Sequence, residues 1–363
     1  MPMFFRRLGL RLLAAGLALS LCAPLRAAEA PRSLTSRHLG AERALQVQLP
    51  DSYAHAPRQR YPLLVVLDAQ PQFEHVAGNV RFLANQGEIP ELIVVGVASG
   101  KRVHDYTQTD WPQAWAGGGG AAKFKRFIAD ELLPSLARDY RVSGERLLLG
   151  HSAAGQFALH VLATEPALFD AYIVTSPSLD WDAGLPVREL EAGFRARERL
   201  PAFVYVAEDL SLGGVLTDQL ALRRVLQTQA PRGLQAEVVA YPKERHASVV
   251  LPGAIDGLRA RYLGHRLPPD DAPVLAEISS TRGIDALGLR FAQLAHTGRS
   301  ATIPEEAFID VAEAHLRRGE VSAAVALLRR AVQAWPDSKD CREALAQALK
   351  KLADAPVQAP ASR

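Results

Sequence analysis

Short apolar runs alternate with longer segments of helical periodicity between residues 35 and 265. Several of the runs consist almost entirely of Val, Ile and Leu, as is typical of strands that are buried on both faces. The pattern predicts strands at 43–49, 61–67, 92–98, 145–149, 171–175, 202–206 and 235–240, and helices at 122–137, 153–164, 214–229 and 252–262. We therefore expect one α/β domain over residues 35–265, with helices on both faces of a mostly parallel sheet.

The pattern changes after residue 265. Residues 266–280 are rich in proline and show no periodicity, so we interpret them as a linker. Amphipathic segments near 304–318, 321–335 and 341–353 then predict a helical tail over residues 281–355. Its small residues and the proline after its second helix, Pro336, resemble a tetratricopeptide repeat. Such a tail either binds a protein partner or forms a short helical cap.

The N-terminal segment has the layout of a secretory signal peptide. It combines a positive start (Arg6, Arg7 and Arg11) with an apolar run at 12–21 and small residues near 26–30. The run is too short to span a bilayer comfortably. We expect residues 1–28 to be cleaved, leaving a periplasmic or secreted protein with no stable membrane insertion. An uncleaved anchor helix is the alternative interpretation.

The signal segment also accounts for the positive charge of the chain. Residues 1–28 hold four arginines and no acidic residue, so their removal takes the formal net charge from +3 to −1. Nothing in that charge favours a nucleic acid partner. Of the two cysteines, Cys22 leaves with the signal and Cys341 remains, so the mature chain has no disulfide.

One serine lies where a predicted strand meets a predicted helix. The segment Gly150-His151-Ser152-Ala153-Ala154-Gly155 follows the apolar run at 145–149 and opens the helix at 153–164. A serine on such a sharp turn is the nucleophile elbow of α/β hydrolases, and it needs small neighbours because the turn strains its backbone. The sequence therefore predicts an α/β-hydrolase fold with Ser152 as the nucleophile.

A serine nucleophile needs a base, an acid and an oxyanion hole. His246 follows the predicted strand 235–240 and is the expected base. Glu208 and Asp209 follow the strand 202–206, and either could be the acid; we lean towards Glu208, and a Ser–His dyad without an acid is a third option. The oxyanion donors are expected to be the N–H of Ala153 and that of Ala69 or Gln70.

Two other kinds of site find no support. The run Gly117–Gly120 is not a phosphate-binding loop, because no Lys-Ser/Thr pair follows it and no strand precedes it. The His and acidic residues show no metal-ligand spacing. We therefore expect neither a metal nor another cofactor.

Together these segments resemble the esterase family related to esterase D, the enterochelin esterases and the periplasmic siderophore trilactone hydrolases. The resemblance covers residues 35–262 and rests on Leu67-Asp68-Ala69, Val94-Val95-Gly96-Val97, Arg102–Thr107, Gly150-His151-Ser152, Ser176–Trp181 and His246–Val249. It implies hydrolysis of carboxylic esters through an acyl-enzyme, without a cofactor. Ala69 and Ala154 stand where the family commonly has Gly.

Three functions follow from this interpretation. The first is hydrolysis of a small-molecule ester, with a siderophore-type lactone as one candidate substrate. The second is acyl transfer, in which an alcohol rather than water intercepts the same acyl-enzyme. The third belongs to another class: a scaffold that acts through the helical tail.

Overall fold

A computed structural model describes residues 32–113, 116–209, 216–263, 271–287, 303 and 305–354. The expected signal peptide, residues 1–28, lies outside the described residues. None of the helices in the described ranges is both long and apolar enough to cross a membrane.

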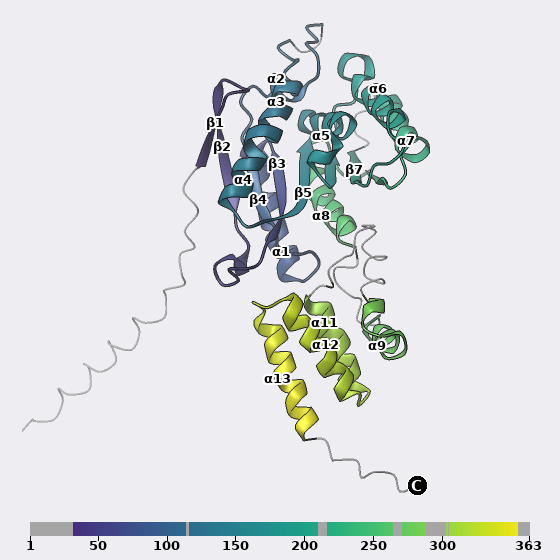
Figure 1. Cartoon of the computed structure of the whole chain (residues 1–363). Coiled ribbons are helices and arrows are strands. Elements are labelled where there is room, and N and C mark those ends of the chain that lie inside the picture. Colours follow the sequence, from purple (N-terminus) through teal and green to yellow (C-terminus); the bar gives the residue numbers. More distant parts are fainter. Residues whose placement is uncertain are drawn as a thin grey trace, which may run out of the picture. The chain divides into compact units, whose positions relative to one another are not determined.

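The core of the α/β domain is an eight-stranded sheet of order β1-β2-β4-β3-β5-β6-β7-β8 (Figure 1). Strands β1 and β2 pair antiparallel, β2 pairs antiparallel with β4, and all the later pairs are parallel. This order is that of the α/β-hydrolase fold. The strands are β1 (Arg32–Ser36), β2 (Ala41–Gln48), β3 (Tyr61–Leu67), β4 (Ile93–Val97), β5 (Val142–His151), β6 (Ala171–Thr175), β7 (Phe203–Asp209) and β8 (Gln235–Tyr241).

Helices cover both faces of the sheet, as the sequence predicted. The helices α1 and α8 share one hydrophobic cluster with the sheet, and α2 to α7 share the other. Their bounds are α1 (Ala69–Asn85), α2 (Arg102–Tyr106), α3 (Ala121–Phe127), α4 (Leu133–Asp139), α5 (Ala153–Thr164), α6 (Trp181–Arg195), α7 (Leu216–Thr228) and α8 (Val250–Arg261). Short 3₁₀ turns occupy Asp51–Ala54 and Pro166–Leu168.

Strand β3 shows why the central strands are continuous apolar runs. Leu63, Val65 and Leu67 belong to the cluster under α2 to α7. Leu64 and Val66 point to the opposite face, into the cluster under α1 and α8. Successive side chains of a strand alternate between faces, so a strand covered on both sides needs an apolar residue at every position.

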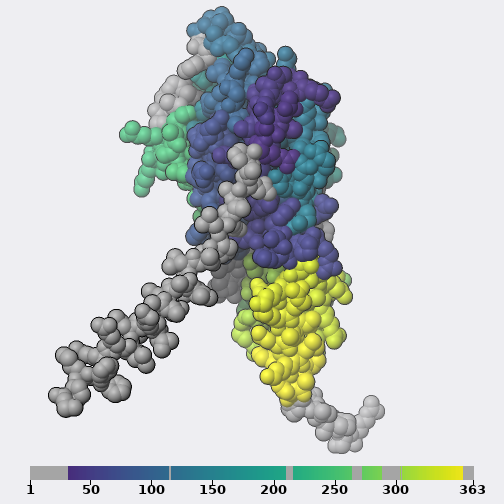
Figure 2. Space-filling view, turned by 90° about the vertical axis from the view of Figure 1, so that its left-hand side faces the viewer, coloured from purple at the N-terminus to yellow at the C-terminus, as the bar shows by residue number. Residues whose placement is uncertain are grey.

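The edge of the sheet looks different. In β1 the side chains alternate between partly buried and exposed before Ser36, and the N-terminal strands lie at the surface in Figure 2. This short polar strand was not predicted, because it lacks the apolar run that marks the central strands.

The predicted helix at 122–137 is three consecutive segments rather than one. Helix α3 passes into a π-helical turn at Ile128–Leu132, and α4 follows. Pro134 explains the change, since proline donates no hydrogen bond and its ring crowds the carbonyl four residues earlier. A wider turn relieves that crowding.

The C-terminal part is helical and has a hydrophobic core of its own. It contains α9 (Asp271–Arg282), α11 (Glu305–Arg317), α12 (Val321–Ala334) and α13 (Lys339–Ala353). The linker prediction for 266–280 needs correction, because α9 begins inside it and buries Leu275 and Ala276. Pro273 is compatible with α9 because it lies in the first turn, where no N–H has an intrahelical partner.

Candidate active site

The residues with candidate chemistry lie at or just beyond the carboxyl ends of β3, β5, β6, β7 and β8, at one edge of the sheet. Ser152 occupies the turn between β5 and α5 with φ 59° and ψ −122°. This positive φ is unfavourable for a non-glycine residue, and strain of this kind is typical of functional turns. The sharp turn predicted for Ser152 is therefore present.

Gly150 makes this turn possible. A Cβ at that position would lie 2.2 Å from the carbonyl oxygen of Ala154, a separation that no side chain tolerates. Ala154 itself is fully buried within α5. The methyl group at Ala154 is thus accommodated, whereas a methyl group at Gly150 would not be.

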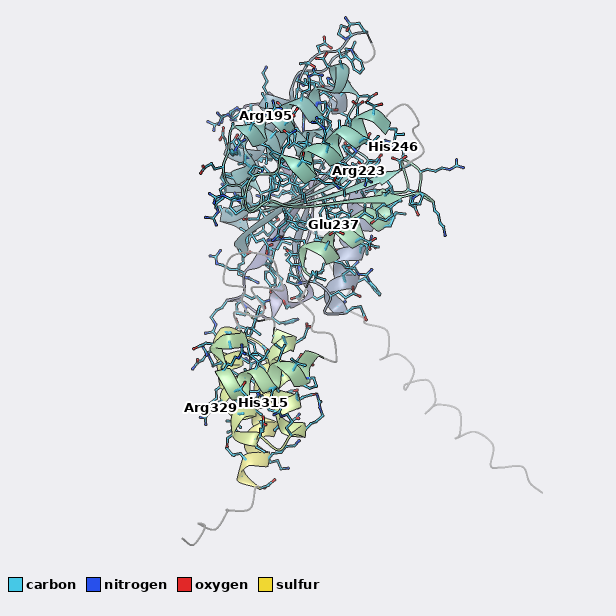
Figure 3. All side chains as sticks on the ribbon, turned by 90° about the vertical axis from the view of Figure 1, so that its right-hand side faces the viewer. Arg195, Arg223, Glu237, His246, His315 and Arg329 are labelled. Carbon is cyan, nitrogen blue, oxygen red and sulfur yellow. The ribbon has the colours of Figure 1, made fainter. Side chains whose placement is uncertain are left out.

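His246 lies on the loop beyond β8, where the sequence predicted the base (Figure 3). Its Nε2 is 3.0 Å from Oγ of Ser152, a hydrogen-bonding distance. Its ring also packs on the ring of His151, with centroids 4.8 Å apart. The end of β5 and the turn after it therefore supply both contacts of His246: the hydroxyl of Ser152 faces its Nε2, and the ring of His151 packs against its imidazole.

His151 can pack there because it is uncharged at neutral pH. Burial, and next the nearby His246, lowers the pKa of His151 to about 4. Its Nδ1 lies 3.1 Å from both the carbonyl oxygen and the hydroxyl of Thr175. The neutral ring can therefore contact His246 without opposing the positive charge that a general base acquires.

The two candidate acids differ sharply in position. The buried carboxylate of Asp209 lies 3.8 Å from Nδ1 of His246. Glu208 pairs instead with Arg223, with Nη2 at 2.6 Å and Nε at 2.8 Å from its Oε2. Burial raises the pKa of Glu208, and Arg223 partly offsets that effect. The preference for Glu208 from the sequence is thus corrected: Asp209 is the carboxylate beside His246.

A hydroxyl that the sequence analysis did not single out fills the gap between Asp209 and His246. Oγ of Ser176 is 2.9 Å from Nδ1 of His246 and donates a hydrogen bond to Oδ1 of Asp209. Ser176 directly follows β6. Its place in the block Ser176–Trp181 was the one signal in the sequence that could have drawn attention to it.

We call residues 175–178 the β6 strap, because their backbone binds the nucleophile turn twice. The N–H of Ser152 donates to the carbonyl of Thr175 at 3.0 Å, and the N–H of Ser178 donates to the carbonyl of Ser152 at 3.2 Å. Oγ of Ser178 is also 3.4 Å from Oγ of Ser152. The strap therefore fixes the nucleophile turn relative to β6.

The predicted oxyanion donors lie at two adjacent helix N-termini. Ala153 begins α5 and Ala69 begins α1, and the strands that precede them, β5 and β3, are neighbours in the sheet. N–H groups in the first turn of a helix have no intrahelical partner and favour negative charge. The side chain of Gln70 exchanges two hydrogen bonds with the backbone of Ser99, so the backbone N–H of Gln70 is its candidate oxyanion donor.

Arg102 links the loop after β3 to the nucleophile turn. Its Nε donates to Asp68 at 2.8 Å, and its Nη2 donates to the carbonyl of His151 at 3.3 Å. Asp68 precedes α1 and has a φ of 54°. Because 41% of the Arg102 side chain is exposed, this cation also faces solvent beside the site.

The glycine-rich loop and His160 each contact an acidic residue of their own. The N–H groups of Gly117 and Gly118 donate to a carboxylate oxygen of Asp110, so this loop binds its own acidic residue. His160 is buried in α5 and its Nδ1 is 2.9 Å from Glu189, in a structural pair away from Ser152.

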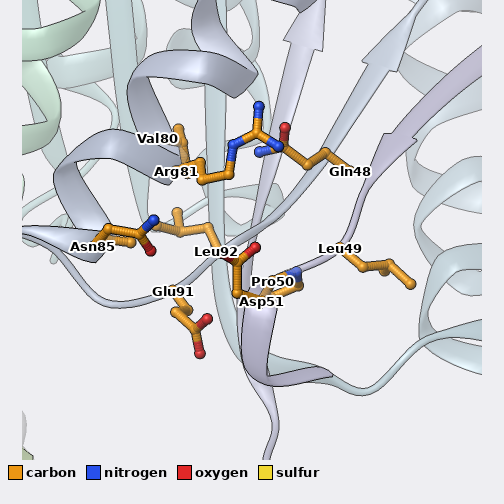
Figure 4. A pocket seen from close by; sticks show the side chains of 10 residues that line it. Gln48, Leu49, Pro50, Asp51, Val80, Arg81, Asn85, Glu91 and Leu92 are labelled. Carbon is orange, nitrogen blue, oxygen red and sulfur yellow. The ribbon is translucent and has the colours of Figure 1, made fainter. Parts of the chain in front are cut away.

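A small cavity lies at the opposite edge of the sheet, between the end of β2, the end of α1 and the start of β4 (Figure 4). The volume in which the centre of a water molecule can be placed is about 10 Å³. That volume suits roughly one water and no organic substrate.

Comparisons with known proteins find related esterases and a helical repeat. Residues 36–204 match the family described as Putative esterase, and residues 305–348 match the tetratricopeptide repeat. The α/β domain is similar to this esterase family over the matched residues, and the chain is a serine hydrolase that acts on esters.

Among curated proteins, the chain is similar to the ferri-bacillibactin esterase BesA of Bacillus subtilis, with 29% identity over 243 residues, covering 59% of this chain and 81% of BesA. Among solved structures, it resembles an IroE-like serine hydrolase from Shewanella oneidensis, with 28% identity and a TM-score of 0.69 over 82% of this chain and 97% of that one. It also resembles the BES protein from Bacillus cereus, with 27% identity and a TM-score of 0.57 over 63% of this chain and 93% of that one.

Proposed function

We propose that the chain hydrolyses siderophore-type lactones through an acyl-enzyme on Ser152. The observation that carries the reaction is the 3.0 Å contact between Oγ of Ser152 and Nε2 of His246 on a strained turn. A serine hydroxyl is a weak nucleophile until an adjacent base accepts its proton, and this contact supplies the base.

The mechanism follows from the contacts. As Oγ of Ser152 bonds to the ester carbon, its proton moves to Nε2 of His246. The N–H groups of Ala153 and of Ala69 or Gln70 stabilise the negative oxygen of the tetrahedral intermediate. His246 then gives its proton to the leaving alkoxide, and an acyl-Ser152 remains. Water releases the acid by the same steps, with His246 again acting as the base.

The substrate class rests on the comparisons. The relatives include a ferri-bacillibactin esterase and an IroE-like serine hydrolase, and the aligned residues cover most of each of those proteins.

A panel of substrates tests this proposal. We expect kcat/KM for a cyclic triester siderophore, with and without iron, to exceed that for a short-chain aliphatic ester by about 100-fold, because the larger substrate has more contacts that discriminate it. Product formation is followed by liquid chromatography. Rapid turnover of aliphatic esters with no cleavage of the lactone would contradict the proposed substrate class while leaving the esterase chemistry intact.

We further propose that the chain is exported and loses residues 1–28. The arginine-rich start, the short apolar run and the small residues near 26–30 support this. Intact-mass analysis of the protein recovered from a periplasmic or culture fraction should place its first residue near 29. A full-length mass in the membrane fraction would instead favour an anchor.

The helical tail supports a second role, binding of a protein partner. The repeat match at 305–348 motivates it, since helices of this class commonly form binding surfaces. A pull-down that compares the full chain with a chain ending at residue 265 tests it. Recovery of the same proteins by both chains would exclude the tail as the binding element.

A further inference from the structure

We propose that Ser176 is a positioning residue that couples Asp209 to His246 through its hydroxyl. This inference rests on the proposed catalytic roles of Ser152 and His246. The carboxylate of Asp209 is 3.8 Å from Nδ1 of His246, beyond hydrogen-bonding reach, whereas Oγ of Ser176 is 2.9 Å from that nitrogen. A direct hydrogen bond between acid and base is thus replaced by two hydrogen bonds through a serine.

Donors and acceptors along this chain have one consistent direction. When the hydroxyl of Ser152 donates to Nε2 of His246, the remaining ring proton is on Nδ1 and must donate. Ser176 Oγ accepts the hydrogen bond from Nδ1–H, and its own O–H then donates to Asp209. The opposite direction would turn the lone pairs of Ser176 towards an ionised carboxylate. The network therefore selects the tautomer of His246 that can accept the proton of Ser152.

The backbone of Ser176 supports a functional interpretation independently. Its φ is 41°, in the region that favours glycine, although it is a serine. Its N–H donates to the carbonyl of Ala207 at 2.7 Å, which anchors the β6 strap to β7 and so to Asp209. A strained conformation held in place by neighbouring strands is typical of residues at functional sites.

No proton is transferred through Ser176 in this scheme. When His246 takes the proton of Ser152, its Nδ1–H continues to donate to Ser176, which keeps its own hydrogen, and Asp209 stays ionised. The other titratable ring facing His246 is His151, which is neutral because burial lowers its pKa to about 4. The positive charge of the imidazolium is thus stabilised by Asp209, with Ser176 aligning the two groups.

The test is Ser176→Ala, assayed on an aryl acetate so that the result does not depend on the siderophore. We expect kcat to fall about 10- to 100-fold, with KM within about twofold. The ascending limb of kcat/KM against pH should move to lower pH, because the imidazolium loses an acceptor. Asp209→Asn should cost markedly less in the Ser176→Ala background than in the wild type.

Controls separate this inference from the proposed function. Ser135→Ala removes another buried hydroxyl, one bonded to Arg32 near Asp139, and should leave both kcat and the pH limb unchanged. Ser176→Gly relieves the positive φ and serves as the test variant if Ser176→Ala does not fold. Suppose that Ser152→Ala is inactive but both Ser176 variants keep the rate and the pH dependence of kcat/KM of the wild type. That result would overturn the coupling role of Ser176 and leave the proposed mechanism intact. An active Ser152→Ala would overturn the proposed mechanism itself. Equal costs of Asp209→Asn in both backgrounds would also reject the coupling.

Discussion

Replacing Ser152 with alanine should lower kcat for ester hydrolysis by about 10⁴- to 10⁶-fold, because no other group then forms the acyl-enzyme. Alanine keeps the Cβ of serine, so the strained turn at φ 59° gains no new clash and the fold should persist. Rates on an aryl acetate measure the loss, and covalent labelling by a fluorophosphonate reports the nucleophile directly. The wild type should be labelled once and Ser152→Ala not at all.

A matched control comes from the same strand. Ser143 lies near the start of β5, at the opposite end from Ser152, and its hydroxyl accepts a hydrogen bond from the N–H of Glu145. Ser143→Ala should retain full labelling and full activity. Labelling that survives in Ser152→Ala would identify a different nucleophile and would sink the mechanism proposed for this site.

The sequence was informative where burial on both faces leaves an unambiguous pattern. Strand β3 and helix α5 lie at the residues predicted for them, 61–67 and 153–164. Helix α1 was missed although its buried residues follow helical spacing, because Pro71 and Gly78 lower its intrinsic helix propensity. Packing of α1 against the sheet outweighs that cost. Gly96 of β4 makes this close packing possible, because a Cβ at that position would lie only 2.6 Å from the ring of Phe73 in α1.

Some residues of the candidate site could be predicted from the sequence and others could not. A strand, a turn and a helix in succession located Ser152, and the loop after β8 located His246. The choice between Glu208 and Asp209 could not be made locally, since consecutive residues of a strand point to opposite faces and either face could meet His246. Ser176 was missed because its role depends on three strands that meet only in the folded sheet.

Asp209→Asn and Glu208→Gln should separate the two carboxylates by their effects. We expect Asp209→Asn to lower kcat by about 10²- to 10⁴-fold, because an uncharged amide cannot stabilise the imidazolium of His246. Glu208→Gln should keep kcat within about threefold of the wild type. Its effect is on stability, because Arg223 loses a buried charged partner, at a cost of about 1–3 kcal/mol.

Steady-state kinetics and urea denaturation of both variants check these expectations together. Each substitution replaces a carboxylate with its amide on the same strand, so the two variants control for each other in size and position. The opposite pattern, an inactive Glu208→Gln beside an active Asp209→Asn, would mean that Glu208 turns from Arg223 to His246 during catalysis. Losses below about threefold in both would leave Ser152 and His246 as a dyad. In that case the bond between Ser176 and Asp209 would serve only to hold the β6 strap against β7.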